Sequence, residues 1–534
     1  MMSDSEFDYI IVGAGSAGCV FANRLVRDGR FSVALVERGR MDINRWIHIP
    51  ATFLKAHQSQ DIDTVISEPD QSLDGRRFPV PQGRVVGGGS SINGMIYMRG
   101  QAADYDDWEN LHGCKGWGYK DVLPIFMRHE KNIDHGAPYH GKDGPLLVSN
   151  PEYKHPLNEL VLDAAQSTGL AWNPDFNGEN QEGVGWYQAT AHAGRRQSSA
   201  TCFLKPIINY EQLTILTDTI ASKICFEGRR ARGLEIVKDG EVQFLRARKE
   251  VILTAGSFHS PKLLMLSGVG PSRELNKHGI EIVHHVSDVG ANYQDHVGAP
   301  VTYKLKSGKG YHDADRGLAA LRNGVDYFVF KRGLLTSNLL SAGACVDTDG
   351  DGRPDLQFNF APFAPGPPGE GPLPYHSFHI HPMTMRPKSR GRLVLASTNP
   401  LDHPKFDAQT LKAEEDLDTL RRGVRLSRDI CAQPVLKEIL GEVIWPGPDI
   451  STMVGSNSLD DAIRKQARTV YHPAGTCRMG ADQRAVVDLR LKVNGVEGLR
   501  VADCSVMPTL VSGNTNAPTM MIADRGADFV LEDA

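Results

Sequence analysis

The sequence predicts an α/β protein, α+β overall, with one domain on a parallel sheet and another on an antiparallel sheet. Three observations favour this fold class. The chain of 534 residues exceeds the size at which a single hydrophobic core stops growing. Apolar runs that end at a glycine or an aspartate, typical of buried parallel strands, begin near residues 9, 250 and 499. Between about 305 and 460 such runs give way to strand-like alternation.

The first predicted unit is a βαβ motif at the N-terminus. Residues 9–12 form an unbroken apolar run, as expected for a strand covered on both faces. From Ser16 onward apolar residues recur at three- and four-residue spacing, which predicts a helix with one face on the sheet, and Gly29 ends it. Residues 32–36 then form a second strand, which places Glu37 at its carboxyl end.

Three glycines of this unit fit the dinucleotide-binding fingerprint. Gly13 permits a tight turn, Gly15 lets a pyrophosphate approach the backbone, and Gly18 lets helix and strand pack closely. The pyrophosphate is then expected at the helix N-terminus. Glu37, twenty-four positions after Gly13, is suited to accept hydrogen bonds from an adenosine ribose. The unit does not distinguish FAD from NAD, and a tight turn without a ligand is the alternative.

Two later stretches are predicted to feed backbone groups toward the same ligand. Residues 83–94, GRVVGGGSSING, let backbone amides crowd against a flat or anionic group, with a flexible linker as the alternative. A buried-strand pattern at 250–255 leads through a turn into a helix ending at 268–270. Residues 499–502 offer a third strand, followed by Asp503.

The middle of the chain predicts a substrate domain. Residues 327–330, 356–360 and 376–381 show strand-like alternation or aromatic content. Residues 365–374 are a Pro/Gly loop suited to line or cover a mouth, and residues 41–74 are predicted as a loop-rich excursion over the site. The predicted nucleotide-binding domain comprises residues 1–150, 195–305 and 461–534, and the predicted substrate domain comprises 151–194 and 306–460.

Composition and charge limit the binding partners and the cellular compartment that we expect. Hydrophobic residues make up 40% and charged residues 23% of the chain, and the net charge of -5 offers no basic field for nucleic acid or anionic lipid. The eight cysteines are scattered, which suits reduced thiols. No apolar run approaches the roughly eighteen residues of a membrane span, and the N-terminus lacks a signal-peptide pattern. We therefore expect a cytoplasmic protein, with peripheral membrane association left open.

The glycine-rich stretches resemble those of the glucose-methanol-choline (GMC) family of FAD-dependent oxidoreductases. Residues 83–93 resemble the first family signature, and residues 256–270 resemble the second. Residues 289–296, VGANYQDH, are similar to a further family block, as is the C-terminal run 471–518. The chain looks most like the bacterial choline, L-sorbose and polyethylene-glycol dehydrogenase branch. Residues 173–178 and 386–391 are particularly similar to sorbose dehydrogenase.

The resemblance implies FAD as the cofactor, held between the first signature and the C-terminal run. Some relatives attach FAD covalently through a histidine, and Ile92 occupies that place here, so we expect a non-covalent flavin. The residues that the pattern and the resemblance assign to the cofactor are Gly13, Gly15, Ser16, Ala17, Gly18, Glu37, Arg38, Arg84, Gly88, Gly89, Ser91, Asn93, Gly94, Asp503 and Ala517.

The implied activity is oxidation of a primary alcohol, of sugar, polyol or glycol type, to an aldehyde. This reaction removes a hydride from carbon and a proton from a weakly acidic hydroxyl, so it needs a base. By resemblance His472 is that base, beside flavin N5, and Asn516 is the second catalytic residue, donating a hydrogen bond to the developing alkoxide. The electron acceptor is expected to be a quinone, a cytochrome or a dye-like compound, and the sequence does not indicate which of these it is. An oxygen-using oxidase and a redox-silent hydroxynitrile lyase are the alternatives.

Three other patterns have plainer interpretations. His379 and His381 alternate on a probable strand, where a metal site competes with a simple cavity lining. Residues 347–352 begin like a calcium loop, but Phe358 stands in the twelfth position, so a hairpin turn is favoured. Cys477 is expected to pack as a small apolar residue rather than to act as a nucleophile. The sequence therefore predicts no metal.

Overall fold

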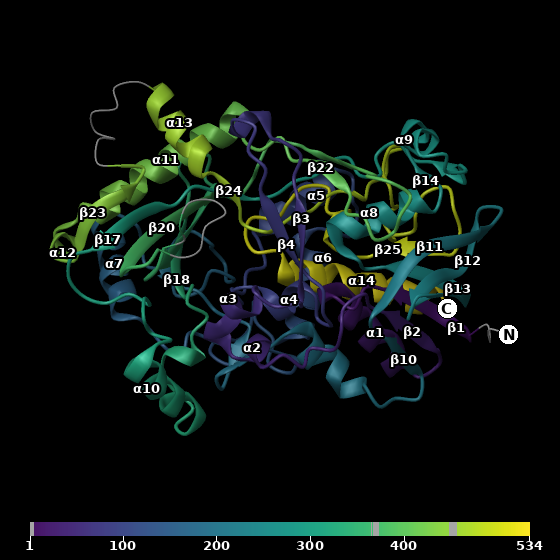
Figure 1. Ribbon diagram of the computed structural model, residues 1–534, viewed down its shortest axis with the longest axis horizontal. Coiled ribbons are helices and arrows are strands. Elements are labelled where there is room, and N and C mark those ends of the chain that lie inside the picture. Colours follow the sequence, from purple (N-terminus) through teal and green to yellow (C-terminus); the bar gives the residue numbers. More distant parts are fainter. Residues whose placement is uncertain (1–4, 365, 367–372, 448–455) are drawn as a thin grey trace.

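The computed structural model describes residues 5–364, 366, 373–447 and 456–534, so most of the predicted Pro/Gly loop at 365–374 lies outside the described residues. Two large sheets lie toward opposite ends of the long axis in Figure 1. One is mixed and the other is antiparallel in all its pairings. This arrangement confirms the predicted fold class.

The first sheet contains the predicted βαβ unit. Its strands are β10 (Leu213–Leu216), β2 (Val33–Val36), β1 (Ser5–Val12), β13 (Glu241–Leu253), β12 (Arg230–Lys238) and β11 (Thr219–Glu227) in spatial order, with β25 (Leu499–Val501) paired to β13. Strands β10, β2, β1, β13 and β25 are parallel. Val12 pairs with both Val36 and Leu253, so three strands end side by side at one edge. This register brings the turn after β1 against the ends of both neighbours.

Two helices at the ends of the described chain pack together beside this sheet (Figure 1). Helix α1 (Ser16–Asp28) buries nine of its thirteen residues and ends at Gly29, whose φ of 83° is left-handed, as the sequence predicted. Helix α14 (Asn516–Asp533) runs against it, and Arg24 of α1 pairs with Asp528 of α14 at 2.7 Å. The C-terminal run is thereby returned to the first turn of the N-terminal unit.

The second sheet joins segments from three parts of the chain. Its strands are β23 (Leu440–Trp445), β17 (Val301–Leu305), β20 (Ser377–Thr384), β19 (Leu356–Ala361), β18 (Ala342–Val346) and β7 (Gly183–Trp186), with β16 (Val297–Gly298) and β24 (Arg468–Thr469) at one side. The strands predicted near 356–360 and 376–381 are present as β19 and β20. Strands β16, β17 and β24 also belong here, although they fall inside the ranges predicted for the nucleotide-binding domain.

One predicted strand is wrong. Residues 327–330 do not form a strand, because Tyr327 and Phe328 end helix α10 (Gly317–Phe328). Aromatic content suggested a strand, whereas the apolar residues between 318 and 328 follow helical spacing. Residues 41–74 are also more ordered than a loop. They contain α2 (Arg45–His48), η1 (Pro50–Thr52), α3 (Phe53–Ala56), β3 (Ile62–Ile66) and η2 (Gln71–Leu73).

Further α-helices and strands complete the two sheets' surroundings. They are the helices α4 (Gly89–Ile92), α5 (Ala102–Asn110), α6 (Tyr119–His129), α7 (Pro156–Ser167), α8 (Gly256–Leu266), α9 (Ser272–Lys277), α11 (Glu414–Cys431), α12 (Pro434–Lys437) and α13 (Ser456–Gln466), and the strands β4 (Pro79–Gly83), β5 (Glu130–Asn132), β6 (Leu146–Val148), β8 (Ala191–His192), β9 (Arg195–Arg196), β14 (Val269–Gly270), β15 (His284–His285), β21 (Arg392–Val394) and β22 (Lys405–Asp407). None of the described helices is long and apolar enough to cross a membrane.

Residues 347–352 lie in the connection 347–355 between the antiparallel strands β18 and β19, as predicted for a hairpin turn. The backbone amides of Gly350 and Gly352 donate to the Asp347 carboxylate at 2.7 and 2.8 Å. The carboxylate of Asp347 is therefore used to close the turn.

Candidate active site

A cavity with a volume of ≈ 510 Å³ is lined by residues at the carboxyl edge of the first sheet and on the face of the second. Its volume lies within the usual range of ligand pockets. Twelve of the fifteen residues predicted for the cofactor line it: Gly13, Gly15, Ser16, Ala17, Glu37, Arg38, Arg84, Gly88, Gly89, Asn93, Gly94 and Asp503. The two predicted catalytic residues, His472 and Asn516, line it as well.

The other three predicted residues lie behind the wall. Gly18 packs against the turn after β1, where a Cβ added at Gly18 would lie 1.9 Å from the Gly13 carbonyl oxygen. Ser91 is buried, with its hydroxyl donating to the Val86 carbonyl at 2.9 Å. Ala517 is buried in the first turn of α14. These residues shape the wall through packing rather than by facing the cavity.

At the end of the cavity next to the first sheet, two positions require glycine for steric reasons. Gly13 has a φ of 102°, and an added Cβ would meet the Thr254 carbonyl oxygen at 2.7 Å. Gly88 has a φ of 49°, and its Cβ would lie 2.7 Å from the Cα of Gly15. The turn after β1 and the glycine-rich stretch therefore touch backbone to backbone. Such a cradle of exposed backbone groups fits a pyrophosphate.

Glu37 lies at the end of β2, where the sequence placed it. Its carboxylate accepts hydrogen bonds from the backbone amides of Ala14 at 2.9 Å and Gly39 at 2.7 Å. Burial raises the pKa of Glu37 above its ordinary value, although these two amides oppose the change. The carboxyl group is held rigidly at the cavity wall, with lone pairs left for the hydroxyl groups of a ribose.

Asp503 links β25 to the start of α8. One carboxylate oxygen accepts from the Gly256 amide at 2.8 Å and the Ser260 hydroxyl at 2.7 Å, and the other accepts from the Ser505 amide at 2.8 Å. Asp503 is 1% exposed, so this network fixes the orientation of the helix N-terminus that borders the cavity.

Ile92 lines the cavity. Its side chain has no nucleophilic atom. Nearby, His57 also lines the cavity, and its Nε2 contacts the Ile92 carbonyl oxygen at 2.9 Å. A carbonyl oxygen only accepts hydrogen bonds, so this His57 nitrogen carries a proton.

At the other end of the cavity, the backbone around His472 is tightly held. Tyr471 has a φ of 70°, which is strained for an aromatic residue. The amide of His472 donates to Asp295 Oδ1 at 2.9 Å, and the hydroxyls of Tyr293 and Thr469 donate to Oδ2 of the same carboxyl. Burial raises the pKa of Asp295 to about 7. Asp295 is thus a positioning residue for His472.

Hydrogen bonds specify which nitrogen of His472 is basic. His296 Nε2 lies 3.0 Å from the Met385 carbonyl oxygen, so it donates, and in neutral His296 the Nδ1 atom must accept. His296 Nδ1 lies 2.9 Å from His472 Nδ1, which therefore carries the proton. The lone pair of neutral His472 is then on Nε2. The amide of Asn514 donates to that nitrogen at 3.3 Å.

Both imidazoles are neutral near pH 7. Removal from bulk water lowers the pKa of His296 to about 4. Removal from water, and then the neighbouring His296, lower the pKa of His472 well below its ordinary value. Because neither imidazole is charged, the hydrogen bonds from the Met385 carbonyl through His296 to His472 keep the proton positions given above.

Asn516 lies at the first position of α14, and its side-chain carbonyl accepts from the Ser16 hydroxyl at 2.8 Å. The amide NH₂ of Asn516 remains available to the cavity. Asn514, rather than Asn516, is the asparagine in hydrogen-bond contact with His472. His296, Asp295 and Asn514 lie inside stretches that the sequence singled out, but no spacing argument pointed to them.

The second sheet supplies polar atoms to the far wall. Asn359 Oδ1 and His381 Nε2 are buried and have no hydrogen-bond partner within the described part of the chain, although both residues line the cavity. His379 Nδ1 forms a hydrogen bond with the Phe363 carbonyl oxygen. Arg468 also lines the cavity, and its charge contributes to lowering the pKa of both histidines.

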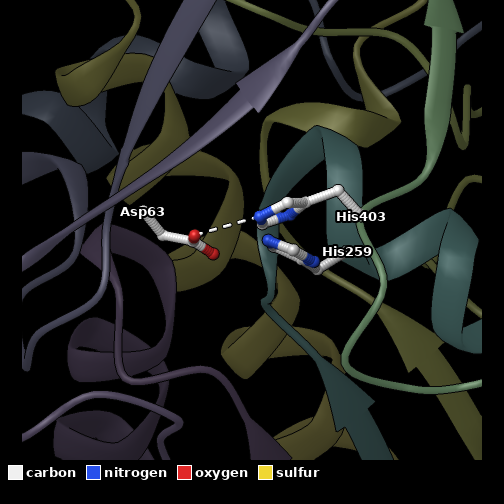
Figure 2. Close-up of side chains that lie close together, drawn as sticks. All are labelled: Asp63, His259 and His403. Carbon is white, nitrogen blue, oxygen red and sulfur yellow. Dashed lines mark ion pairs between the residues drawn. The ribbon is translucent and has the colours of Figure 1, made fainter.

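Two clusters of described residues bring three metal-ligating atoms within 4.8 Å of one another, and neither contains His379 or His381. One is the exposed turn at Asp347, Asp349 and Asp351. The other, shown in Figure 2, joins Asp63 of β3, His259 of α8 and His403, with His403 Nε2 at 3.1 Å from Asp63 Oδ1.

Of the three residues in Figure 2, His259 lines the cavity. Arg38 also donates to the Asp63 carboxylate. Desolvation, then Arg38 and Lys262, lower the pKa of both imidazoles. The same positive charges oppose the binding of a metal cation, so we interpret the cluster as a polar link among three segments.

Cys477 is fully buried, and burial raises the pKa of its thiol well above the ordinary value. This thiol lacks the lowered pKa of a nucleophilic cysteine. It packs as a small apolar residue, as the sequence predicted.

Comparison with known proteins identifies the family. The N-terminal GMC oxidoreductase pattern matches residues 7–298, and the C-terminal pattern matches residues 387–523. The alcohol dehydrogenase [acceptor] of Pseudomonas putida is 40% identical over 536 residues, covering 98% of this chain and 96% of the relative. The mitochondrial choline dehydrogenase of Mus musculus is 39% identical, covering 98% of this chain and 89% of the relative.

Solved structures agree with these relatives. Pyridoxine 4-oxidase from Mesorbium loti superposes with a TM-score of 0.88 at 28% identity, covering 98% of this chain and 99% of that one. Formate oxidase superposes with a TM-score of 0.91 at 26% identity, covering 100% and 99% of the two chains. The chain therefore belongs to the GMC oxidoreductase family, whose members bind FAD.

Proposed function

We propose that this enzyme oxidises a primary alcohol to an aldehyde, with His472 as the base and a non-covalently held FAD as the cofactor. The observation that carries the proposal is the hydrogen-bond chain from Met385 through His296 to His472. It leaves a neutral imidazole with its Nε2 lone pair at the cavity, which is the form that accepts a proton from a hydroxyl.

The flavin, when bound, supplies the hydride acceptor. The turn at Gly13 and Gly15, the glycine-rich stretch and Glu37 support binding of its adenosine diphosphate part at one end of the cavity. Ile92 offers no atom for covalent attachment, which supports a cofactor released by denaturation.

His472 takes the hydroxyl proton on Nε2 while the substrate oxygen gains negative charge. A substrate hydroxyl would displace the Asn514 amide from His472 Nε2. The amide groups of Asn514 and Asn516, which both line the cavity, are then suited to donate hydrogen bonds to the substrate oxygen. The Ser16 hydroxyl holds Asn516 by its carbonyl, so that its NH₂ group is the part left to face the reacting atoms.

The far wall supports a neutral, hydroxylated substrate of sugar, polyol or glycol type. Asn359 Oδ1 and His381 Nε2 are unpaired polar atoms on that wall, and hydroxyl groups would satisfy both. Arg468 places a positive charge there. Among the residues that line the described cavity, carboxylates are contributed by Glu37 and Asp503, both engaged elsewhere. A cationic alcohol such as choline is therefore disfavoured.

Anaerobic addition of alcohols to the purified holoenzyme tests the proposal. A neutral polyol or glycol is expected to bleach the flavin absorbance, and choline is expected to bleach it far more slowly. Bleaching that needs no His472, shown with His472→Ala, would contradict the base assignment. Acid precipitation of the protein is expected to leave the flavin in solution, whereas covalent flavin would precipitate with the chain.

The same preparation separates the rival functions. Rapid recolouring when air is admitted would indicate an oxidase. Slow recolouring that a quinone or an electron-accepting dye accelerates would indicate a dehydrogenase working with such an acceptor. A flavin that no alcohol bleaches, together with cleavage of cyanohydrins, would indicate a lyase.

A further inference from the structure

Helix α10 is amphipathic, and its apolar face points away from the protein. Leu318, Leu321, Val325 and Phe328 recur at three- and four-residue spacing, so they share one face. Their exposed fractions are 85%, 65%, 43% and 62%. All twelve residues of α10 are described, and Tyr327 is the one that is buried. An apolar helix face ordinarily packs on the core, so this inverted orientation calls for another apolar surface.

The apolar surface continues beyond the helix. Val329 and Phe330 are 66% and 57% exposed. Among the described residues, six of the eighteen exposed large hydrophobic side chains lie between positions 318 and 330. We call residues 316–332 the α10 surface. Single exposed apolar residues are common, whereas such a gathering marks an interaction site.

The α10 surface is fixed to the body of the protein. The Tyr327 hydroxyl donates to the Gly194 carbonyl at 2.8 Å. The turn η5 (Leu334–Thr336), which follows the surface, packs against η1 beside the cavity-lining Phe53. In Figure 1 the helix projects from the lower edge of the molecule, away from both sheets. The apolar face is thus presented on a fixed support.

Positive charges flank the apolar face. Arg316, Arg322 and Arg332 are 75%, 85% and 71% exposed in their side chains, and each lies 3.3–3.8 Å from the carboxylate of Asp313 or Asp326. Residues 309–332 carry five Lys or Arg and three Asp, a net charge of +2, whereas the whole chain carries -5. An apolar face bordered by long cationic side chains is the composition of helices that lie in the interface of an anionic membrane.

We propose that the α10 surface docks on an anionic lipid bilayer. The apolar face would enter the boundary of the acyl chains, and the arginines would reach the headgroup phosphates. A twelve-residue helix is about 18 Å long, too short to span a bilayer, so it lies in the membrane plane. A second copy of the chain fits less well, because a two-fold contact would set the same positive charges against each other. The proposal does not depend on the reaction.

Vesicle sedimentation of the holoenzyme tests the docking. Wild type is expected to sediment with vesicles of phosphatidylcholine and phosphatidylglycerol, weakly with phosphatidylcholine alone, and less in high salt. The double variant Leu321→Asp, Phe328→Asp is expected to lose at least about tenfold in partitioning. Leu111→Asp is the matched control, because Leu111 is 74% exposed at the end of a different helix, α5, and this variant is expected to bind as wild type.

A charge variant tests the contribution of the arginines to lipid binding. Arg316→Gln, Arg322→Gln is expected to weaken binding about fivefold per charge to anionic vesicles, with little change on neutral ones. All variants must keep the circular dichroism spectrum and the bound flavin of wild type.

Three outcomes would overturn the proposal. The first is wild type that fails to bind anionic vesicles, and the second is a Leu321→Asp, Phe328→Asp variant that binds them as well as wild type. The third is light scattering that finds a lipid-free dimer, abolished by the same substitutions, with no vesicle binding. The third result would assign the surface to a second copy.

Discussion

Replacing His296 with leucine tests whether the tautomer of His472 is set by its neighbour. His296 Nδ1 is the acceptor for the His472 Nδ1 proton at 2.9 Å, and leucine removes it while keeping an apolar group of similar size. The buried donor left without a partner costs about 1–3 kcal/mol. The proton then shifts toward Nε2, the nitrogen that must be free to accept. The variant is expected to lose about 5- to 150-fold in kcat.

Two further variants frame this measurement. His472→Ala is expected to cost about 10²- to 10⁴-fold, the usual contribution of a general base. In that background His296→Leu should have no further effect, because the base it orients is gone. His296→Asn restores an acceptor oxygen near the position of Nδ1, so part of the activity should return.

The assay is anaerobic stopped-flow reduction of the flavin by saturating alcohol, which isolates the chemical step from reoxidation. A rate for His296→Leu within twofold of wild type would refute the tautomer argument. Equal rates for His296→Leu and His296→Asn would refute it too, since a purely structural role gives an acceptor no advantage.

The remaining predictions concern the cofactor, stability and specificity. Gly18→Ala is expected to abolish flavin binding, because its Cβ would meet a backbone oxygen at 1.9 Å, and absorbance of the purified variant checks it against Gly324→Ala, where no atom lies within 4 Å. Burial lowers the pKa of His379 to about 4, so the neutral form is favoured in the folded state. Stability from this histidine is present above pH 6.5 and is lost as pH falls toward 4. In urea titrations His379→Phe should therefore lose less free energy of unfolding across that window than wild type, by up to about 3 kcal/mol, and an equal loss would contradict the assignment. Arg468→Gln should raise kcat/KM for choline relative to a neutral polyol, and an unchanged ratio would show that this charge does not select the substrate.

The net charge of the whole chain does not reveal the local positive charge around the α10 surface. The net charge of -5 gave no reason to expect binding to an anionic membrane, but residues 309–332 carry +2. The same residues also misled the secondary-structure prediction. Tyr327 to Phe330 are aromatic and β-branched, and only the spacing back to Leu318 reveals a helix.

Local rules were sufficient where sequence neighbours create the geometry. The turn after β1 needs glycine at Gly18 because the carbonyl oxygen of Gly13, five positions earlier, would lie 1.9 Å from an added Cβ, and the sequence predicted this glycine. The position of Glu37 follows from strand length alone. The glycine pattern and the family motifs also named His472, Asn516 and the twelve cofactor residues that line one cavity.

Only the tertiary structure decided how the base is made. The hydrogen-bond partners of His472 are Asp295, His296 and Asn514, which are 42 to 177 positions away in the chain. Which nitrogen is basic depends on the Met385 carbonyl, which reaches His472 through His296. The direction in which α10 faces depends on the anchoring of Tyr327 to Gly194. Sequence patterns report contacts between residues a few positions apart, whereas proton positions and exposed faces are set by contacts that form only when distant segments pack together.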